Sequence, residues 1–401
     1  MSQLRPFRAL HPAPAVAHRV ASVPYDVVNT EEARALAATE PLSFLRVTRS
    51  EVDLPADTHP YADVVYAQAV ANFEDLKRAA PMQLDDTPSL YFYRLTMRGH
   101  VQVGLAGCFS VDEYDRGLIK KHEKTRKEKE DDRTRHISEL RAQTGVVFLT
   151  YRHSFAVDRI TARVIATPPL FAFTADDGIR HELWRVVGPD VDALVAAFAE
   201  LPALYIADGH HRAASASRAK AALNGAGESA AFIAVAFPET EMQILPYNRV
   251  VKDLAGHTPE SLVEALRTRV AVKPGAPTPS RAGCVSMYVG GAWYELTLPT
   301  PASGTPRDAA LDVAVLQSQV LEPVLKVGDP RTDKRIDFVG GLRGTGELER
   351  LVNSGAAAVA FSMVATTIED LMAIADAGGI MPPKSTWFEP KLRDGLLVHL
   401  I

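Results

Sequence analysis

The sequence predicts an α+β fold built on mixed sheets. Segments with helical and β periodicity alternate irregularly along the 401 residues, and several neighbouring strand-like runs are joined by short turns typical of hairpins. Apolar residues make up 47% of the chain and charged residues 23%, as in ordinary globular proteins. A doubly wound parallel sheet would require a more regular succession of strand and helix. The length corresponds to roughly two to three domains.

Composition argues against several classes of protein. No apolar run approaches the ~20 residues of a membrane span, and the first twenty residues lack the unbroken apolar stretch of a secretory signal. Two cysteines, Cys108 and Cys284, are too few for a disulfide framework or a zinc site. We therefore expect a cytoplasmic protein with no membrane partner. The net charge of −5 makes a nucleic-acid partner a poor expectation, but it is compatible with a local basic pocket for phosphate.

The first predicted range, residues 1–110, is an N-terminal α/β segment. The short apolar run at 23–28 is followed by Asn29 and Thr30, either of which suits a helix N-cap, with glutamates in the first turn after it. Apolar residues recur at helical spacing over 61–78 and predict a helix. The runs at 90–95 and 101–105 predict a hairpin.

The second predicted range, residues 111–255, contains most of the chemistry-bearing residues. Its charged stretch at 120–135 has the mixed signs of a solvated helix. An alanine-rich helix is expected to end at the glycine cluster after residue 223. The other expected elements are strands at 146–151, 170–174, 181–187 and 204–207, a helix at 191–201, and strands at 232–237 and 241–251 that pair with each other.

The third predicted range, residues 256–401, is a C-terminal α/β domain. A helix and a proline- and glycine-containing connector at 257–281 mark the preferred boundary. The remaining expected elements are a hairpin at 285–298, helices at 312–326, 347–353 and 368–377, and strands at 336–339 and 356–363. The segment 381–391 is unlike a random loop, and we interpret it as a binding segment or a stiff packing clasp.

The most specific motif is Asp208-Gly209-His210-His211-Arg212, where a strand runs through a tight turn into a helix. The start of such a helix presents unpaired N–H groups and the positive end of its dipole, and is therefore an anion site. The two histidines and Arg212 add donors, and an arginine fork matches phosphate oxygens. The alternative without a function is a surface turn whose polar side chains face solvent. A metal site is a weaker interpretation, because sequence neighbours on a turn diverge.

A second candidate is His122-Glu123-Lys124-Thr125. Glu123 is the only acid within residues 120–126, so its carboxylate is expected to stay ionised and to accept a proton or hold Mg²⁺. Taken alone, a surface salt bridge explains this pattern better. Residues 384–386 lack the glycines of a P-loop, and the spacing in 340–346 fits neither a P-loop nor the dinucleotide motif.

Together these motifs resemble the bacterial DUF1015 family over almost the whole chain. The matching segments are 23–28, 122–125, 205–212, 245–249 and 381–391. The segment at 208–212 is also similar to the phosphate motif of the ParB/sulfiredoxin-like superfamily, which includes free-serine kinases. The resemblance implies a ParB/sulfiredoxin-like nucleotide-binding core within 111–255. The chain departs from the small kinases by the roughly 85 residues between Glu123 and Asp208, and from the usual Leu-Pro-x-His-Arg pattern by carrying Asn248.

The resemblance also implies roles for individual residues. Glu123 and His122 would be catalytic, and the accessory residues would be Thr125, Arg249 and Lys384. Asp208 would bind Mg²⁺ or fix a histidine tautomer. Phosphate would be bound by Asp208, Gly209, His210, His211 and Arg212.

The function implied is a kinase that uses ATP or ADP, with Mg²⁺, to phosphorylate free L-serine or a similar small alcohol. The alternative is a nucleotide-binding regulatory or ParB-like DNA-associated protein without kinase activity. A nuclease is a third interpretation, but no carboxylate cluster for two metals is visible. The acceptor, the choice between ATP and ADP, the oligomeric state and the role of the C-terminal domain stay open. The kinase hypothesis requires Glu123 to lie at the loop that begins at residue 208.

Overall fold

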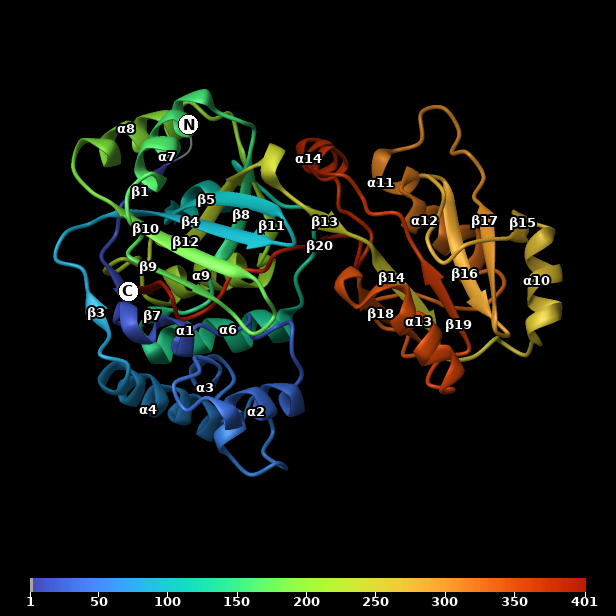
Figure 1. Ribbon diagram of the computed structural model, residues 1–401, viewed down its shortest axis with the longest axis horizontal. Helices are drawn as coiled ribbons and strands as arrows, with labels where there is room; N and C mark the ends of the chain where they lie inside the picture. Colours follow the sequence, from blue (N-terminus) through green and yellow to red (C-terminus); the bar gives the residue numbers. More distant parts are fainter. Residues whose placement is uncertain (1–2) are drawn as a thin grey trace. The chain divides into compact units, whose positions relative to one another are not determined.

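The chain, whose computed structural model describes residues 3–401, forms two compact units (Figure 1). The first unit holds the chain up to Met242 together with Pro390–Ile401, and the second unit is Gln243–Glu389. The second unit is therefore inserted between two parts of the first. The predicted ranges 1–110 and 111–255 contribute strands to one sheet of the first unit.

A large mixed sheet organises the first unit, in agreement with the predicted α+β class. Parallel and antiparallel neighbours occur side by side, since β12 is parallel to β8 and antiparallel to β5. The strands follow the spatial order β6 (Ile119–Lys120), β11 (Leu204–Asp208), β8 (Val147–Tyr151), β12 (Ala231–Pro238), β5 (His100–Ser110), β4 (Leu90–Met97), β10 (Arg180–Val186) and β9 (Phe171–Thr174), with β1 (Leu4–Arg5) beside β5.

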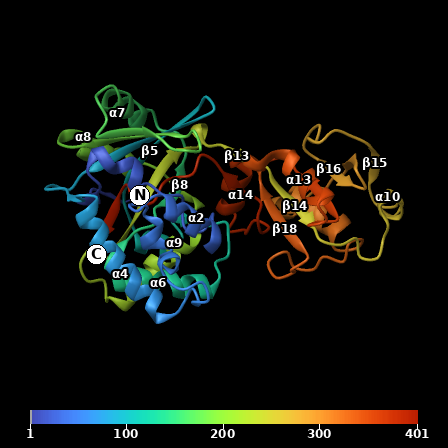
Figure 2. The ribbon, with the colours of Figure 1, turned by 60° about the horizontal axis from the view of Figure 1, so that its bottom comes forward.

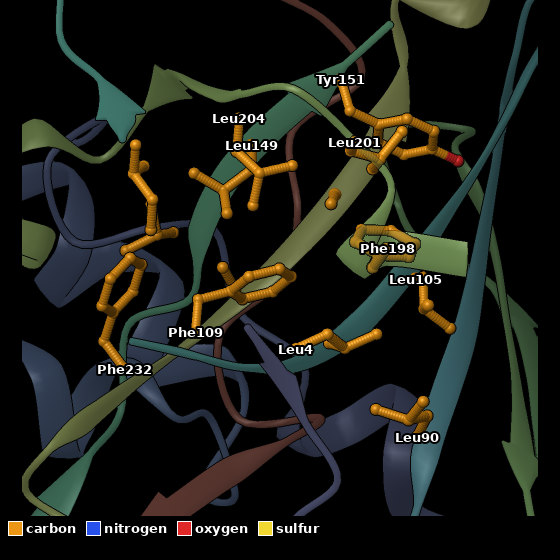
Figure 3. Close-up of a cluster of buried hydrophobic side chains, with 14 of the residues drawn as sticks. Leu4, Leu90, Leu105, Phe109, Leu149, Tyr151, Phe198, Leu201, Leu204 and Phe232 are labelled. Carbon is orange, nitrogen blue, oxygen red and sulfur yellow. The ribbon is translucent and has the colours of Figure 1, made fainter. Parts of the chain in front are cut away.

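Helices cover both faces of this sheet. Figures 1 and 2 show α7 (Phe155–Ile165) and α8 (Pro189–Ala199) on one side, with α6 (Lys127–Leu140) and α9 (His210–Ala222) on the other. Leu149 of β8 and Phe198 of α8 belong to one cluster of buried hydrophobic side chains (Figure 3). Burial of such side chains contributes roughly 1.5–3 kcal/mol each, which fixes the sheet that carries the site.

The remaining elements of the first unit surround a small sheet. Its strands, in spatial order, are β3 (Gln83–Leu84), β2 (Ala9–His11), β21 (Val398–Leu400) and β7 (Ala142–Gln143). The other helices are α1 (Ala17–Val20), α2 (Thr30–Thr39), α3 (Leu45–Thr48), α4 (Asp63–Ala79) and α5 (Val111–Asp115), with short 3₁₀ turns at Pro14–Val16, Ser50–Asp53 and Glu239–Glu241.

The predicted N-cap of α2 is confirmed. The Asn29 side-chain oxygen accepts the Glu32 N–H at 2.9 Å, and the Glu32 carboxylate accepts the Asn29 N–H at 2.9 Å. This reciprocal capping box satisfies two backbone donors at the start of the helix. It also fixes where the preceding segment, residues 23–28, enters the helix.

The second unit is built on its own sheet. The strands, in spatial order, are β15 (Ala271–Pro274), β17 (Ala292–Thr297), β16 (Cys284–Val289), β19 (Val359–Ser362), β14 (Tyr247–Val251) and β18 (Ile336–Gly340), and a separate pair joins β13 (Ile244–Leu245) to β20 (Trp387–Phe388). The helices are α10 (Pro259–Arg267), α11 (Arg307–Ala310), α12 (Asp312–Leu316), α13 (Gly344–Asn353) and α14 (Ile368–Asp376), with a π-helical turn at Gln317–Leu321 and a 3₁₀ turn at Gly341–Arg343.

Two predictions of local structure were wrong. The segments 232–237 and 241–251 do not pair, because β12 belongs to the large sheet of the first unit and β14 to the sheet of the second. The charged helix begins at Lys127 instead of residue 120, because Ile119 and Lys120 pair with β11. No helix in the described part of the chain combines the length and the apolar character needed to cross a membrane.

Candidate functional site

The site begins with two parallel strands at one end of the large sheet. Leu204 of β11 pairs with Ile119 of β6, and Tyr205 pairs with Lys120, in parallel register. Parallel neighbours end at the same sheet edge, and this is where α/β proteins commonly bind ligands. The pairing therefore brings the loop 121–126 and the turn after Asp208 together, although about 85 residues separate them in sequence.

The turn into α9 has the predicted passage from a strand through a glycine directly into a helix. Gly209 adopts φ 89°, a left-handed conformation that L side chains rarely take, and a Cβ there would lie 3.2 Å from Nη1 of Arg212. The Ala213 N–H donates to the Gly209 carbonyl at 3.0 Å, so the helix starts at once. Gly209 has no side chain, so it makes no side-chain hydrogen bond that caps the helix.

Two histidines join the loop to the start of the helix. The His122 N–H donates to Nε2 of His210 at 3.4 Å, and the two rings lie perpendicular with centroids 4.4 Å apart. Because Nε2 of His210 accepts this bond, its proton resides on Nδ1. That Nδ1 lies 3.8 Å from Oε2 of Glu123. The structure thus brings Glu123, His122 and His210 together, as the kinase hypothesis requires.

Burial keeps the histidines of the site neutral. It lowers the pKa of His122 to about 4, lowers that of His210 well below its ordinary value, and also lowers that of His211. At pH 7 these rings supply hydrogen bonds without positive charge. Glu123 is 46% exposed, so its carboxylate is accessible to a ligand in solvent.

Two further predicted residues fasten the loop. The Arg126 N–H donates to Nε2 of His211 at 3.0 Å, and the Thr125 hydroxyl donates to the Glu130 carboxylate at the beginning of α6. The first bond holds the loop 121–126 against α9, and the second bond holds it against α6. The geometry gives His211 and Thr125 a positioning role in the site.

Asp208 is held at the end of β11 by two donors. Its Oδ1 accepts the Gly209 N–H at 2.8 Å, and its Oδ2 accepts Nζ of Lys391 at 2.9 Å. Burial would raise the pKa of this carboxyl, but Lys391 and Arg212 outweigh burial and hold the pKa well below its ordinary value. Asp208 is therefore ionised and fixes the turn.

The donor set at Asp208 does not fit a protein-held Mg²⁺. Both carboxylate oxygens are engaged, one of them by an ammonium group that a cation would have to displace. Within residues 3–401, no group of three or more His, Cys, Asp or Glu side chains is arranged to hold a metal ion. Asp208 is therefore better suited to fixing the turn than to binding Mg²⁺.

Arg212 lies beside the turn and is bound by groups of the protein. Its side chain is 6% exposed, Nη2 donates to both oxygens of Asp26 at 3.0 and 2.9 Å, and Nη1 donates to the Val146 carbonyl at 2.6 Å. Burial opposes the charge, but Asp26 and Asp208 outweigh it and raise the pKa of the guanidinium above its ordinary value. The charge of Arg212 is already balanced by these carboxylates.

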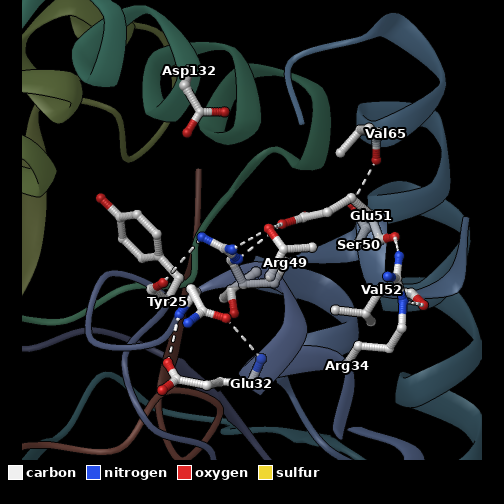
Figure 4. Close-up of polar contacts among 12 residues, drawn as sticks. Tyr25, Glu32, Arg34, Arg49, Ser50, Glu51, Val52, Val65 and Asp132 are labelled. Atoms are coloured by element: carbon white, nitrogen blue, oxygen red, sulfur yellow. Dashed lines mark hydrogen bonds and ion pairs between the residues drawn. The ribbon is translucent and has the colours of Figure 1, made fainter. Parts of the chain in front are cut away.

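The segment that carries Asp26 is anchored by its own polar network (Figure 4). Arg49 donates to the Tyr25 carbonyl at 3.5 Å and to the Thr30 hydroxyl at 2.7 Å, and it pairs with Glu51 at 2.9 Å. The sequence marks 23–28 as a motif but assigns no function to Asp26. The network holds in place the segment 23–28, whose Asp26 pairs with Arg212.

The other two predicted accessory residues lie in the second unit. Arg249 is buried, donates to the Tyr247 carbonyl, and donates to the Lys384 carbonyl at 3.0 Å. Burial lowers the pKa of Arg249 to about 10. Nζ of Lys384 lies 5.6 Å from the centroid of the Tyr247 ring. These contacts tie the segment after Met381 to β14, which agrees with a packing clasp.

Comparison with solved structures finds distant similarity. A conserved hypothetical protein from Pyrococcus furiosus is 15% identical (TM-score 0.37), with 74% of this chain and 95% of that chain covered. A free serine kinase in complex with AMP is 13% identical (TM-score 0.38; 74% and 92% covered). SbnI from Staphylococcus aureus, truncated at its C-terminus, is 13% identical (TM-score 0.40; 74% and 87% covered).

Comparison with curated proteins gives no match. Comparison with protein families gives a match to one family over most of the chain. The matched region includes the loop 121–126, the turn at 208–212 and the anchored motif at 23–28. The matched residues are 4–317, and the matching family is described as a protein of unknown function, DUF1015. The chain therefore belongs to the DUF1015 family.

Proposed function

We propose that this protein is a kinase that transfers the terminal phosphoryl group of ATP or ADP to the hydroxyl of free L-serine or a similar small alcohol. One observation carries the proposal: Oε2 of Glu123 lies 3.8 Å from Nδ1 of His210, at the first residue of α9. A carboxylate beside a helix start that can bind phosphates is the pair of groups that a hydroxyl kinase needs.

The phosphates of the nucleotide would bind at the start of α9. Gly209 itself has no side chain, and the N–H groups of His210 and His211 lie in the first turn of α9, at the positive end of the helix dipole. Because the imidazoles are neutral, they donate or accept hydrogen bonds without competing for a proton. The strand-to-helix turn supports the proposal that a ParB/sulfiredoxin-like nucleotide-binding core lies within 111–255.

Glu123 would act as the general base. The oxygen of the acceptor hydroxyl attacks the terminal phosphorus, the bond from that phosphorus to the bridging oxygen breaks, and the hydroxyl proton passes to the Glu123 carboxylate. The shortened nucleotide leaves with the electron pair of the broken bond. Nδ1–H of His210 faces Glu123 and orients it, while His122 fixes the His210 tautomer through its backbone N–H.

The first test is direct. Purified protein incubated with L-serine and either ATP or ADP, in buffer containing Mg²⁺, should form phosphoserine, detected by mass spectrometry. Glu123→Gln should lower the rate about 10²- to 10⁴-fold, the usual contribution of a general base. Nucleotide binding should change little in that variant. Glu128→Gln, an exposed carboxylate in the first turn of α6, is the matched control and should keep full activity.

The outcomes separate the alternatives. Nucleotide binding without transfer to any of a panel of amino acids and small alcohols would contradict the kinase and favour a regulatory nucleotide-binding protein. Equal activity of Glu123→Gln and Glu128→Gln would contradict only the role of Glu123 as general base, and not the kinase activity itself. Binding of DNA that weakens steeply with added salt would favour the DNA-associated alternative.

A further inference from the structure

The proposed phosphate site needs a cation that the predicted motif does not supply. Nucleotide phosphates carry several negative charges, and a helix dipole is equivalent to only about half a charge. Arg212 is engaged by both oxygens of Asp26 and by the Val146 carbonyl. The buried imidazoles of His122 and His210 bring hydrogen bonds but no charge.

Lys391 is a cation that the structure places at the turn, bound to Asp208. It belongs to the segment 390–401, which returns to the first unit after the inserted second unit. Its Nζ lies 2.9 Å from Oδ2 of Asp208, and Oδ1 of the same carboxylate accepts the N–H of Gly209, the residue that precedes α9. The Lys391 side chain is 13% exposed, so it is largely but not completely buried.

We propose that Lys391 is a phosphate-binding residue, whose ammonium contacts the terminal phosphate oxygens of a nucleoside di- or triphosphate at the start of α9. This inference rests on the proposed function and adds a residue to its site. Asp208 acts as the positioning residue, because its ionised carboxylate holds Nζ at the turn and stabilises the charged form of the amine. Lysine ammonium groups carry three N–H donors, so a lysine can bridge a carboxylate and a phosphate.

A second lysine–aspartate pair on the same helix provides a matched control. Nζ of Lys220, in the last turn of α9, pairs with the Asp112 carboxylate. This pair lies at the negative end of the helix dipole, where a nucleotide phosphate would not bind. Lys220→Met therefore removes a lysine–aspartate pair, more exposed than that of Lys391, from the far end of α9 without touching the proposed site.

The experiment compares ligands that differ only in phosphate number. Affinities for ADP, AMP and adenosine are measured by calorimetry on the wild type, Lys391→Met and Lys220→Met. Lys391→Met should weaken ADP binding about ten- to a hundredfold, the usual range for a lost hydrogen bond to a charged group, and should leave adenosine binding within about twofold. Lys391→Arg should recover part of the ADP affinity. Lys220→Met should bind all three ligands like the wild type.

A second variant covers the risk of misfolding. Lys391→Met leaves the Asp208 carboxylate without its partner, so Lys391→Met/Asp208→Asn removes both charges and should fold where the single variant does not. The same selective loss of ADP affinity is expected from it. An equal change for ADP and adenosine, or no change, in either folded variant overturns the assignment and leaves Lys391 a structural latch. Failure of the wild type to bind any nucleotide would instead refute the proposed function.

Discussion

Two buried arginines, one in each unit, show how differently the same residue type can be used. Arg212 in the first unit meets both oxygens of Asp26, and its pKa is raised. Arg249 in the second unit meets the carbonyls of Tyr247 and Lys384, and burial lowers its pKa to about 10. Arg212 was predicted to bind phosphate, and the family resemblance implied an accessory role for Arg249. The comparison shows that a neighbouring carboxylate, or its absence, decides in which direction the pKa of a buried arginine shifts.

The largest effect that sharpens this comparison is expected at Arg212. Arg212→Met removes one partner of a mostly buried ion pair and leaves Asp26 uncompensated, so the free energy of unfolding should fall by about 3 kcal/mol. Urea unfolding monitored by circular dichroism measures the change. Arg212→Met/Asp26→Asn should recover part of the loss, because neither charge is then left alone. A single variant as stable as the wild type would show that the pair contributes nothing.

A smaller, pH-dependent effect is expected at Asp394, a buried carboxyl close to the same pair. Burial raises its pKa to about 7, against the opposing charge of Arg212 and with the support of Asp26. The ordinary pKa of this carboxyl group is 3.8. Between pH 3.8 and about pH 7, the native state therefore holds a proton that the unfolded state has lost. The stabilisation is full below that range and is lost as the pH rises through about 7.

The measurement for Asp394 is the slope of stability against pH. From pH 5 to pH 7 this group should lower the free energy of unfolding of the wild type by up to about 1.4 kcal/mol per pH unit. Asp394→Asn cannot titrate, so its contribution to the slope should vanish while the other groups stay the same. Parallel curves for the wild type and the variant would show that Asp394 does not hold its proton.

The smallest effect is expected at Arg249. Arg249→Met replaces a buried charge that meets carbonyl oxygens with an apolar side chain of similar length. The lost hydrogen bonds and the relieved desolvation nearly cancel, so stability should change by no more than about 1 kcal/mol. The same urea titration as for Arg212→Met provides the comparison. If Arg249→Met loses as much stability as Arg212→Met, the distinction between the two arginines is lost.

Local patterns predicted much of the site. The sequence predicted three local features, because each depends on a few neighbouring residues. They are the capping residue Asn29, the glycine turn at 209 and the helix after that turn. Residues 155–165 form a helix that carried no prediction. The pairing predicted for 232–237 with 241–251 failed because apolar alternation specifies a strand without specifying its partner.

The long-range parts of the site could not be read from the sequence. Asp26 and Lys391 lie 186 and 183 residues from the groups that they bind, Arg212 and Asp208. No local pattern links positions so far apart. The neutrality of His122 also depends on burial, which appears only once the sheet and helices have packed.

The insertion of the second unit sets an order of events during synthesis. Strand β21 lies between β2 and β7, and it pairs His399 with Ala9 and with Gln143. At about 5–20 residues per second, a ribosome needs many seconds to pass from Met242 to the residues that complete this sheet. Gln243–Glu389, which is continuous in sequence, can fold in that interval, whereas the first unit must wait with an open strand position and a chaperone could bind there. The fragment that ends at Met242 therefore lacks both β21 and Lys391, and the nascent protein gains the amine that we propose to bind phosphate only after the second unit has been synthesised.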